Sequence, residues 1–335
     1  MRKAVVLISL LFMGWQLRAQ DIHFSQFNFS PMNLNPAMAG QFDGDYRFVA
    51  NHRTQWRSVT QPYQTTGGSV DARQPLDIKN LGAGLSMYSD KAGDSQLSTF
   101  QLNLAASYLL PVSRDSLHSI AFGVQTGLTH RKINYEDLYF DQQYNNGIFN
   151  PNSATGEAFA REARTYLNLN LGASYFWKVA HRKMITGGVA LHNISRPRQS
   201  FYNDPEIKLD VRWTAHASAE WEVTDKIDVL PSILYMHQGP HRQFTLGAMG
   251  RYILKDYPGV YRAVFLGWHG RTRDAGFLTA GLEYDNWQVG VSYDINFSQL
   301  NVASNYRGGF EISAIYIFRQ QKIRRVIHKS CPDFL

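Results

Sequence analysis

Strict alternation of apolar and polar residues is the feature that most limits how this chain can fold. From Trp287 to Phe297 every odd-numbered residue is apolar or aromatic, and every even-numbered residue is polar or glycine. Because successive side chains of a β-strand point to opposite faces, such a segment has one apolar and one polar face. Many strands of this kind, each about ten residues long, are typical of a transmembrane β-barrel with a polar lumen.

About 14 segments of the chain have this strand character, an even number as in single-chain bacterial outer-membrane barrels. We therefore predict an all-β fold, a transmembrane antiparallel β-barrel over residues 46–318. The last strand is expected to pair with the first, since an open edge in lipid costs several kcal/mol per unpaired backbone group. The predicted strands are 46–57, 63–72, 80–89, 97–110, 119–130, 165–177, 184–194, 209–222, 226–237, 243–254, 260–270, 276–284, 287–297 and 309–318.

The first 19 residues resemble a secretory signal peptide. Two basic residues, Arg2 and Lys3, precede an apolar run from Ala4 to Trp15, which is too short to span a bilayer. A small residue, Ala19, closes a candidate cleavage site. A membrane anchor or a buried strand is the alternative interpretation. The mean hydropathy of −0.32 agrees with a barrel, because half of each strand is polar.

The segment 20–45 does not alternate, and it contains Pro31 and Pro36, which cannot donate to a strand ladder. Its many apolar residues argue against a free tail. We predict a plug or brace packed in or under the barrel, with a disordered arm that orders on binding as the alternative. The apolar residues are Phe24, Phe27, Phe29, Met32, Leu34 and Met38.

The lengths of the connections predict the orientation of the barrel. The longest connections, 131–164, 195–208 and 298–308, all follow odd-numbered predicted strands. Outer-membrane barrels have short periplasmic turns and longer extracellular loops. With the first strand starting in the periplasm, Asn146 is expected outside the cell and Asp225 in the periplasm.

No motif for catalysis or metal binding stands out. The chain has 11 histidines, but none lies in a His-Glu-x-x-His pattern, and its single cysteine, Cys331, cannot form an intramolecular disulfide. Neither a Gly-x-Ser-x-Gly elbow nor a phosphate-binding glycine loop is present. We predict no enzyme activity, no cofactor and no metal site; an outer-membrane hydrolase with a triad assembled in three dimensions is a less favoured alternative.

Charged residues are predicted on the lumen side of several strands. Such charges form ion-pair networks that fill the lumen, or they line a path for a solute or polypeptide. The net charge of +7 comes partly from the segment 319–335, a basic periplasmic tail that is expected to be solvated and to contact a partner or lipid headgroups. Without a nucleic-acid-binding motif, this charge does not predict nucleic acid as a partner. The predicted lumen-facing charges are Arg47, Arg53, Arg57, Arg212, Glu220, Asp294 and Glu311.

The long connection 131–164 is unusually rich in aromatic residues. Exposed aromatic side chains on a loop are common anchors for a protein partner, so these residues are the candidate partner-binding site. They could instead belong to the outer aromatic girdle of the barrel or pack on one another. The candidate residues are Tyr135, Tyr139, Phe140, Tyr144 and Phe149.

Short motifs at both ends of the mature chain resemble the PorP/SprF family of outer-membrane proteins, which is associated with type IX secretion and gliding motility in Bacteroidetes. The resemblance spans the mature chain but is weak over 131–208. At the C-terminus, Asp333 stands where the family pattern has arginine. The matching motifs are Phe24-Ser25-Gln26, Leu34-Asn35-Pro36-Ala37, Ala39-Gly40, Gln55-Trp56, Ser69-Val70-Asp71, Ser292-Tyr293-Asp294-Ile295-Asn296, Ala303-Ser304-Asn305, Gly308-Gly309-Phe310-Glu311-Ile312-Ser313 and Cys331-Pro332.

The resemblance implies a non-enzymatic barrel in the cell outer membrane that supports type IX secretion or the surface attachment of a large secreted protein. The implied partners are type IX secretion components, the C-terminal domain of a secreted cargo protein, or both, together with outer-membrane lipid. Some family members resemble core components, and others serve one adhesin each. A passive or ligand-gated solute channel, using the same polar lumen as a pore, is the alternative function.

Overall fold

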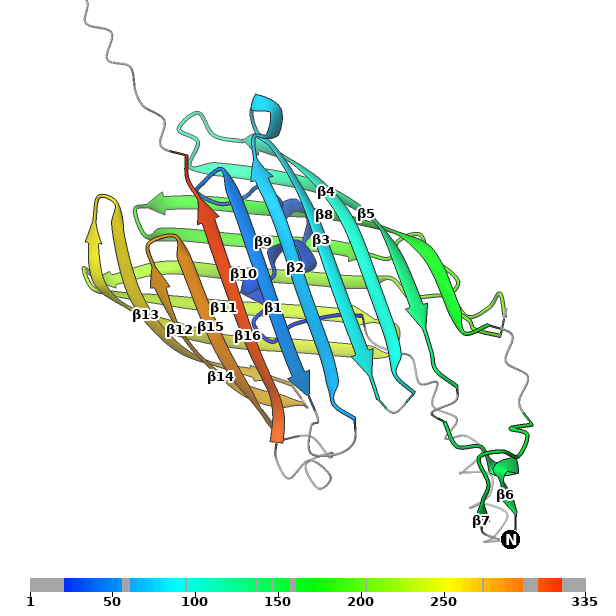
Figure 1. Ribbon diagram of the computed structural model, residues 1–335. Helices are drawn as coiled ribbons and strands as arrows, with labels where there is room; N and C mark the ends of the chain where they lie inside the picture. The colour runs from blue at the N-terminus through cyan, green and yellow to red at the C-terminus, as the bar shows by residue number, and fades with distance from the viewer. Residues whose placement is uncertain are drawn as a thin grey trace, which may run out of the picture.

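The protein is a closed antiparallel β-barrel of 14 strands in a computed structural model (Figure 1). Each strand pairs with its neighbours in the order β1-β16-β15-β14-β13-β12-β11-β10-β9-β8-β5-β4-β3-β2. The predicted fold class is confirmed. The structure describes residues 21–55, 61–93, 95–135, 138–145, 148–156, 161–202, 204–272, 274–297 and 307–320.

Every segment predicted as a strand forms one, with ends that differ by a few residues. Strand β10 begins at Arg212 rather than at 209, because Leu209 is buried and its N–H bonds to the carbonyl of Pro197 in the preceding connection. The barrel strands are β1 (Tyr46–Gln55), β2 (Tyr63–Arg73), β3 (Leu81–Ala92), β4 (Leu97–Pro111), β5 (His118–Lys132), β8 (Ala163–Ala180), β9 (Lys183–His192), β10 (Arg212–Thr224), β11 (Ile227–Gln238), β12 (His241–Tyr257), β13 (Val260–Arg271), β14 (Ala275–Tyr284), β15 (Trp287–Asn296) and β16 (Arg307–Phe318).

The first and last strands close the barrel, as predicted. Strand β1 pairs with β16 along its whole length, from Tyr46 opposite Phe318 to Gln55 opposite Gly309. This pairing leaves neither strand with an open edge, which a bilayer would penalise strongly.

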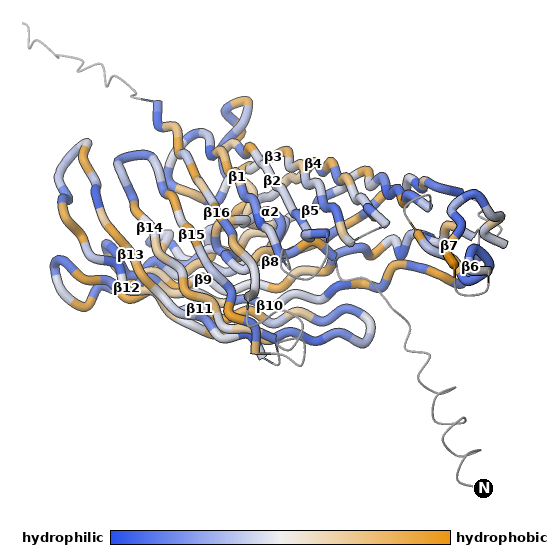
Figure 2. The backbone as a smooth tube through the Cα atoms, turned by 60° about the horizontal axis from the view of Figure 1, so that its bottom comes forward, coloured by the Kyte–Doolittle hydropathy of each residue, from blue (hydrophilic) through white to orange (hydrophobic). Residues whose placement is uncertain are grey.

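The two faces of the barrel wall follow the sequence alternation (Figure 2). On β5 the side chains of Gln125 and Thr129 are buried in the lumen, whereas Phe122, Val124 and Leu128 are exposed on the outside. Apolar side chains on the outside of such a wall meet lipid, and polar ones fill the lumen. Within the described ranges, the helices are all too short or too polar to span a bilayer.

Long and short connections lie at opposite ends of the barrel. The connection 133–162, after β5, carries the 3-10 helix η4 (Asp141–Gln143) and a small sheet of β6 (Tyr144–Asn145) and β7 (Ile148–Phe149), which lies well beyond the barrel wall (Figure 1). The connection 193–211, after β9, is at the same end, here named the loop end. The opposite end, where β1 begins, is the turn end; there Asp225 and Lys226 alone join β10 to β11.

The N-terminal segment packs inside the barrel (Figure 1). It folds into η1 (Phe27–Phe29), α2 (Pro31–Leu34) and η2 (Pro36–Met38), and prolines begin the second and third of these. Proline suits the first turn of a helix, where its missing N–H would have no partner. Phe29 packs in a buried cluster with side chains of four barrel strands, which are Val49, Met249, Phe265 and Ile315.

Candidate functional site

The N-terminal segment passes along the lumen from the loop end to the turn end. At the loop end, Asp21 N donates to Gln238 at the end of β11, and Asn193, just after β9, donates to the Asp21 carboxylate at 3.1 Å. Arg212, at the start of β10, lies 3.5 Å from the same carboxylate and donates to the Ile22 carbonyl. At the turn end, Asp45 N donates to the carbonyl of Phe318. The segment therefore runs through the barrel before the chain turns into β1.

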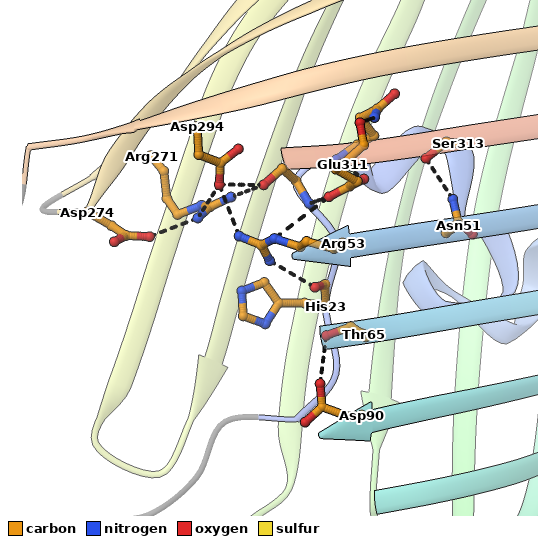
Figure 3. A network of polar contacts seen from close by, with 12 residues as sticks. His23, Asn51, Arg53, Thr65, Asp90, Arg271, Asp274, Asp294, Glu311 and Ser313 are labelled. Carbon is orange, nitrogen blue, oxygen red and sulfur yellow. Dashed lines mark hydrogen bonds and ion pairs between the residues drawn. The ribbon is translucent and has the colours of Figure 1, made fainter. Parts of the chain in front are cut away.

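A cluster of buried charges holds the segment near the loop end (Figure 3). The carboxylate of Glu311 on β16 accepts from the backbone N–H groups of Ser25 and Gln26 at 2.8 and 2.9 Å. The carboxylate of Asp294 on β15 accepts from Ser25 Oγ at 2.9 Å and pairs with Arg53 of β1 at 3.0 Å. Glu311 is fully buried. Ser25, Arg53, Arg271, Asp294 and Glu311 are named the latch cluster below.

Arg271 on β13 completes the latch cluster. Its guanidinium donates to Ser25 Oγ at 2.7 Å and lies 2.8 Å from Asp274 and 3.6 Å from Asp294. Buried charges are costly unless they are paired and hydrogen-bonded. Because the cluster combines arginines with carboxylates, each buried charge has an opposite partner, and the segment adds neutral donors to both carboxylates.

A β-bulge lies opposite Asp294. On the β16 side Tyr293 pairs with Phe310 and Ile295 with Arg307, so that two residues of β16, Gly308 and Gly309, face the single residue Asp294. Bulges commonly redirect a side chain at a functional position. Gly308 lies in the bulge, and a Cβ at that position would lie 2.1 Å from the Asp294 carbonyl oxygen, so the bulge requires glycine there.

His23 contacts the latch cluster through its backbone. Its carbonyl accepts from Arg53 at 3.1 Å, and its ring Nδ1 lies 3.1 Å from the Asp21 carbonyl. The segment therefore binds an arginine of the cluster as well as its carboxylates.

A second anchor holds the middle of the segment. The side chain of Asn35 is fully buried; its Nδ2 contacts Ser174 Oγ at 3.0 Å and the Ala173 carbonyl at 3.1 Å, both on β8. Its Oδ1 accepts from Ala37 N. A Cβ at Gly172 would lie 1.9 Å from Asn35 Oδ1, so glycine on β8 allows this close approach.

A third anchor lies toward the turn end. Arg47 of β1 forms two hydrogen bonds to Asp71 of β2, at 3.0 and 2.7 Å, and donates to the Met38 carbonyl. The Asp71 carboxylate also accepts from Gly40 N at 2.7 Å. Bidentate arginine–carboxylate pairs are among the stronger hydrogen-bonded contacts in proteins. The segment is thus bonded to the wall near both ends and in the middle.

Another charge cluster lies at the turn end, away from these three anchors. Asp228 on β11 is fully buried and accepts from Arg182, in the turn after β8, and from Arg251 on β12. Arg251 also pairs with Glu220 and lies 3.6 Å from Glu283. These ion pairs join strands β10, β11, β12 and β14 along the inner face of the wall.

The lumen-facing charges predicted from alternation are found where expected, and their interpretation as an ion-pair network is confirmed. Arg47, Arg53, Arg212, Asp294 and Glu311 are buried in the lumen, and Glu220 pairs with Arg251; Arg57 lies outside the described residues. Three small cavities border the N-terminal segment and have volumes of about 10 to 20 Å³. Each has room for roughly one water molecule.

Sequence reasoning missed several residues of these clusters. Asp71, Asp228, Arg251 and Arg271 are all buried on the lumen side of their strands. The signal that would have found them is the same alternation: each is a charged residue at an inward position of an otherwise regular strand. The donors contributed by the N-terminal segment carry no such signal, because that segment has no strand period.

The predicted aromatic site on the connection 133–162 is partly assembled. The ring of Phe149 lies 4.8 Å from that of Tyr139 and 5.3 Å from that of Tyr144, centroid to centroid. Tyr139 is 72% exposed and Tyr144 is 49% exposed, so these rings pack together and still face outward. Tyr135 instead donates to the Arg161 carbonyl, and Phe140 N donates to Gln143. Tyr135, Tyr139, Phe140, Tyr144 and Phe149 are together named the loop aromatic site. Ile148 lies beside Phe149 and is 73% exposed, and it was not predicted.

Among the described residues, no group of three or more histidine, cysteine, aspartate or glutamate side chains could hold a metal ion.

The sequence model of the Type IX secretion system membrane protein PorP/SprF family matches residues 16–316. The chain belongs to this family. A PorP/SprF protein with this closed barrel lies in the outer membrane and is part of the type IX secretion system.

The fold of the chain is similar to those of solved structures. The Ralstonia pickettii toluene transporter TbuX matches with a TM-score of 0.51 and 10% identity, over 87% of this chain and 94% of that one. The Pseudomonas putida toluene transporter TodX matches with a TM-score of 0.48 and 10% identity, over 88% and 93%. At such identity, the likeness to TbuX concerns the barrel fold alone. No curated protein matches the chain.

Proposed function

We propose that this PorP/SprF barrel is a non-enzymatic attachment protein, which holds a secreted protein at the cell surface by binding its C-terminal domain through the loop aromatic site. The N-terminal segment inside the lumen is the observation that carries this proposal, because a filled lumen argues against a route through the barrel and favours the loop end as the contact surface. Family membership supports a role with type IX secretion components.

The occupied lumen argues against passage of cargo through the barrel. A 14-stranded barrel has a limited interior, and here residues 21–45 and inward side chains fill it. A folded protein has no room to pass, so contact with a cargo domain must use residues outside the wall.

The loop aromatic site has the character of a protein contact surface. Tyr139 and Tyr144 expose large rings that Phe149 supports from behind, and Ile148 adds an aliphatic side chain. Tyrosine and other large apolar groups are enriched among residues that dominate binding energy. Since the small sheet β6–β7 lies beyond the wall, a partner domain can reach it without contacting the membrane (Figure 1).

Loop shortening tests this proposal. Replacing residues 133–162 by a short turn should leave β5 and β8 paired and the barrel inserted, while surface retention of the cargo is lost. Shortening the connection 193–211 at the same end is the matched control and should preserve retention. If the first variant still holds its cargo, the loop aromatic site is not the contact. The basic tail around Arg324 and Arg325, which lies outside the described residues, then becomes the better candidate.

The competing function is a passive or ligand-gated solute channel, which requires an open path along the lumen. The anchors at Glu311, Asn35 and Asp71 hold the N-terminal segment across that path. Purified protein in planar bilayers should therefore show little or no ion conductance. Stable, voltage-independent openings of the intact protein would favour the channel over the attachment role.

A further inference from the structure

A short polar strip lies on the outer wall of the barrel, where lipid is expected. Ser98 of β4 pairs with Lys91 of β3 on one side and with Lys132 of β5 on the other. The side chains of Lys91 and Lys132 are exposed, in the same outward-facing series as Met87 on β3 and Leu128 on β5. Three neighbouring strands thus present lysine, serine and lysine side by side toward the membrane.

At the next outward position of these strands the row is mixed: Phe100 of β4, which is 39% exposed, lies between Ser89 of β3 and His130 of β5. Two histidine–threonine contacts flank Phe100: His130 with Thr165 of β8, and His52 of β1 with Thr66 of β2, each at 2.9 Å. Two positions further along, the outward row is wholly apolar: Met87, Leu102, Leu128 and Leu167 are paired across β3, β4, β5 and β8, and all are exposed. The outer wall therefore changes from an apolar row, through a mixed row, to a row with two lysines near the loop end.

The other side of the barrel has a different rim. Near the loop end, β10, β11, β13, β15 and β16 each present a large exposed aromatic residue outward, as in the usual interfacial girdle. Strand β12 presents one exposed outward cation there, Arg242, whereas the strip on β3 to β5 carries two lysines in one row. The exposed aromatic residues of the opposite rim are Trp213, Tyr235, Trp268, Tyr293 and Phe310.

We propose that Lys91, Ser98 and Lys132 form a binding surface for the phosphorylated headgroup of an outer-leaflet lipid, whose acyl chains lie along the apolar row below. Two strand spacings separate the lysines, about 10 Å, and both flexible stems can converge on one headgroup. Lysine ammonium groups bind phosphate as compact charges. The inference is independent of the proposed role in cargo attachment.

The charges on this strip are available to a ligand. Among the described residues, no carboxylate forms an ion pair with Lys91 or Lys132. Asp90, the neighbour of Lys91, points to the other face and accepts from Thr65 Oγ1 at 2.6 Å (Figure 3). Cationic residues near a membrane surface attract anionic lipid with about 1 kcal/mol each.

A lipid fits this surface better than a second protein because both parts of the surface match one amphiphile. Cations and hydroxyl groups lie at the rim, and a continuous apolar wall follows toward the bilayer centre. A protein partner would have to cover the apolar row within the membrane. Copurification of a second membrane protein that depends on these lysines would oppose the lipid assignment.

The test uses the full-length mature barrel, purified in an uncharged detergent, with purified lipid A as the probe. Native mass spectrometry counts the lipid molecules that remain bound. The double variant Lys91→Gln/Lys132→Gln should lower the apparent affinity about twenty-five-fold, the product of about fivefold per lysine. The matched control Lys226→Gln/Lys255→Gln removes two exposed lysines near the turn end and should bind like the wild type.

Two further measurements make the result decisive. Heat-modifiable gel mobility and circular dichroism should show that both double variants are folded barrels, and Ser98→Ala, which keeps both lysines, should bind with a smaller loss. Dephosphorylated lipid A should bind as weakly as lipid A binds to the Lys91/Lys132 variant. An equal loss of affinity for lipid A in both double variants would overturn the proposal. So would wild-type protein that binds dephosphorylated lipid A as tightly as it binds lipid A.

Discussion

Arg53 of β1 pairs with Asp294 of β15 at 3.0 Å, although β16 lies between these two strands. The ion pair therefore spans the closing seam from inside the lumen. Ser25 Oγ of the N-terminal segment donates to the same carboxylate, and the Glu311 carboxylate, on the intervening strand, accepts from the backbone N–H groups of Ser25 and Gln26. The seam and the segment consequently stabilise each other through one buried cluster.

Removing the Glu311 carboxylate should destabilise the barrel strongly. Glu311→Ala leaves the N–H groups of Ser25 and Gln26 without acceptors and Arg53 with one buried partner fewer, which we expect to lower the free energy of unfolding by about 3–5 kcal/mol. Denaturant titration of the detergent-solubilised barrel measures the loss. Glu206→Ala, an exposed carboxylate on the connection 193–211, is the control and should change stability by less than about 0.5 kcal/mol.

Deleting the N-terminal segment should open the lumen. Without residues 24–38, the wall strands keep their pairing, but the space now filled by Phe29, Met32 and Asn35 becomes free. We expect an inserted barrel with higher permeability to small solutes, measured by antibiotic sensitivity or by bilayer conductance, or with lost cargo binding. A deletion that leaves both permeability and cargo attachment unchanged would contradict the plug assignment.

Single substitutions in the loop aromatic site should weaken cargo binding without affecting the barrel. Tyr139→Ala and Phe149→Ala each remove part of one packed aromatic group, and we expect a loss of about 2 kcal/mol, near thirtyfold in Kd, for the isolated C-terminal domain of the cargo. Surface plasmon resonance measures the affinity. Tyr202→Ala removes an exposed tyrosine from the other long connection and serves as the control. Similar losses in all three variants would indicate a broader contact than proposed.

Cysteine labelling on whole cells should report the orientation. In a Cys331→Ser background, cysteine at Asn152 in the connection 133–162 should react with an impermeant maleimide, and cysteine at Asp225 should stay protected. The expectation rests on the longer connections lying outside the cell. The opposite pattern would place the loop end in the periplasm.

An epitope tag placed just before Asp21 should be reached by antibody from the same side as Asn152. Asp21 is bonded to Asn193 and Gln238 at the loop end, although β1 begins at the turn end. A tag accessible only from the periplasm would show that the segment does not run through the lumen in this direction.

Alternation alone was enough to predict the wall of the barrel. Strands such as β5 and β15 carry a period of two that places Gln125 and Asp294 inward, and closure then follows because lipid does not tolerate free strand edges. Strand β13 also alternates, and its inward residues Arg271 and His269 have hydrogen-bond partners in the lumen.

The partners of the inward charges were beyond the reach of the sequence. Arg53 and Asp294 meet across an intervening strand, and the bulge opposite Asp294 breaks the simple register count. The direction of the N-terminal segment was also hidden, because many of its hydrogen bonds use backbone N–H groups, which every residue except proline carries. Composition indicated that the segment packs against the barrel, but not which way it runs.

The direction of that segment has a consequence for how the molecule assembles. The bond from Ser25 N to Glu311 joins residues separated by 286 positions, and it lies inside a wall that is continuous once β1 meets β16. Contacts so distant in sequence form slowly, because the chain loses the entropy of a large loop before it gains the favourable free energy of the contacts. The pairing of β1 with β16 spans almost the same sequence distance, so the seam and the segment contacts form at a similar stage of assembly. If the seam closed first, residues 21–45 would have to enter the lumen through an end of the barrel.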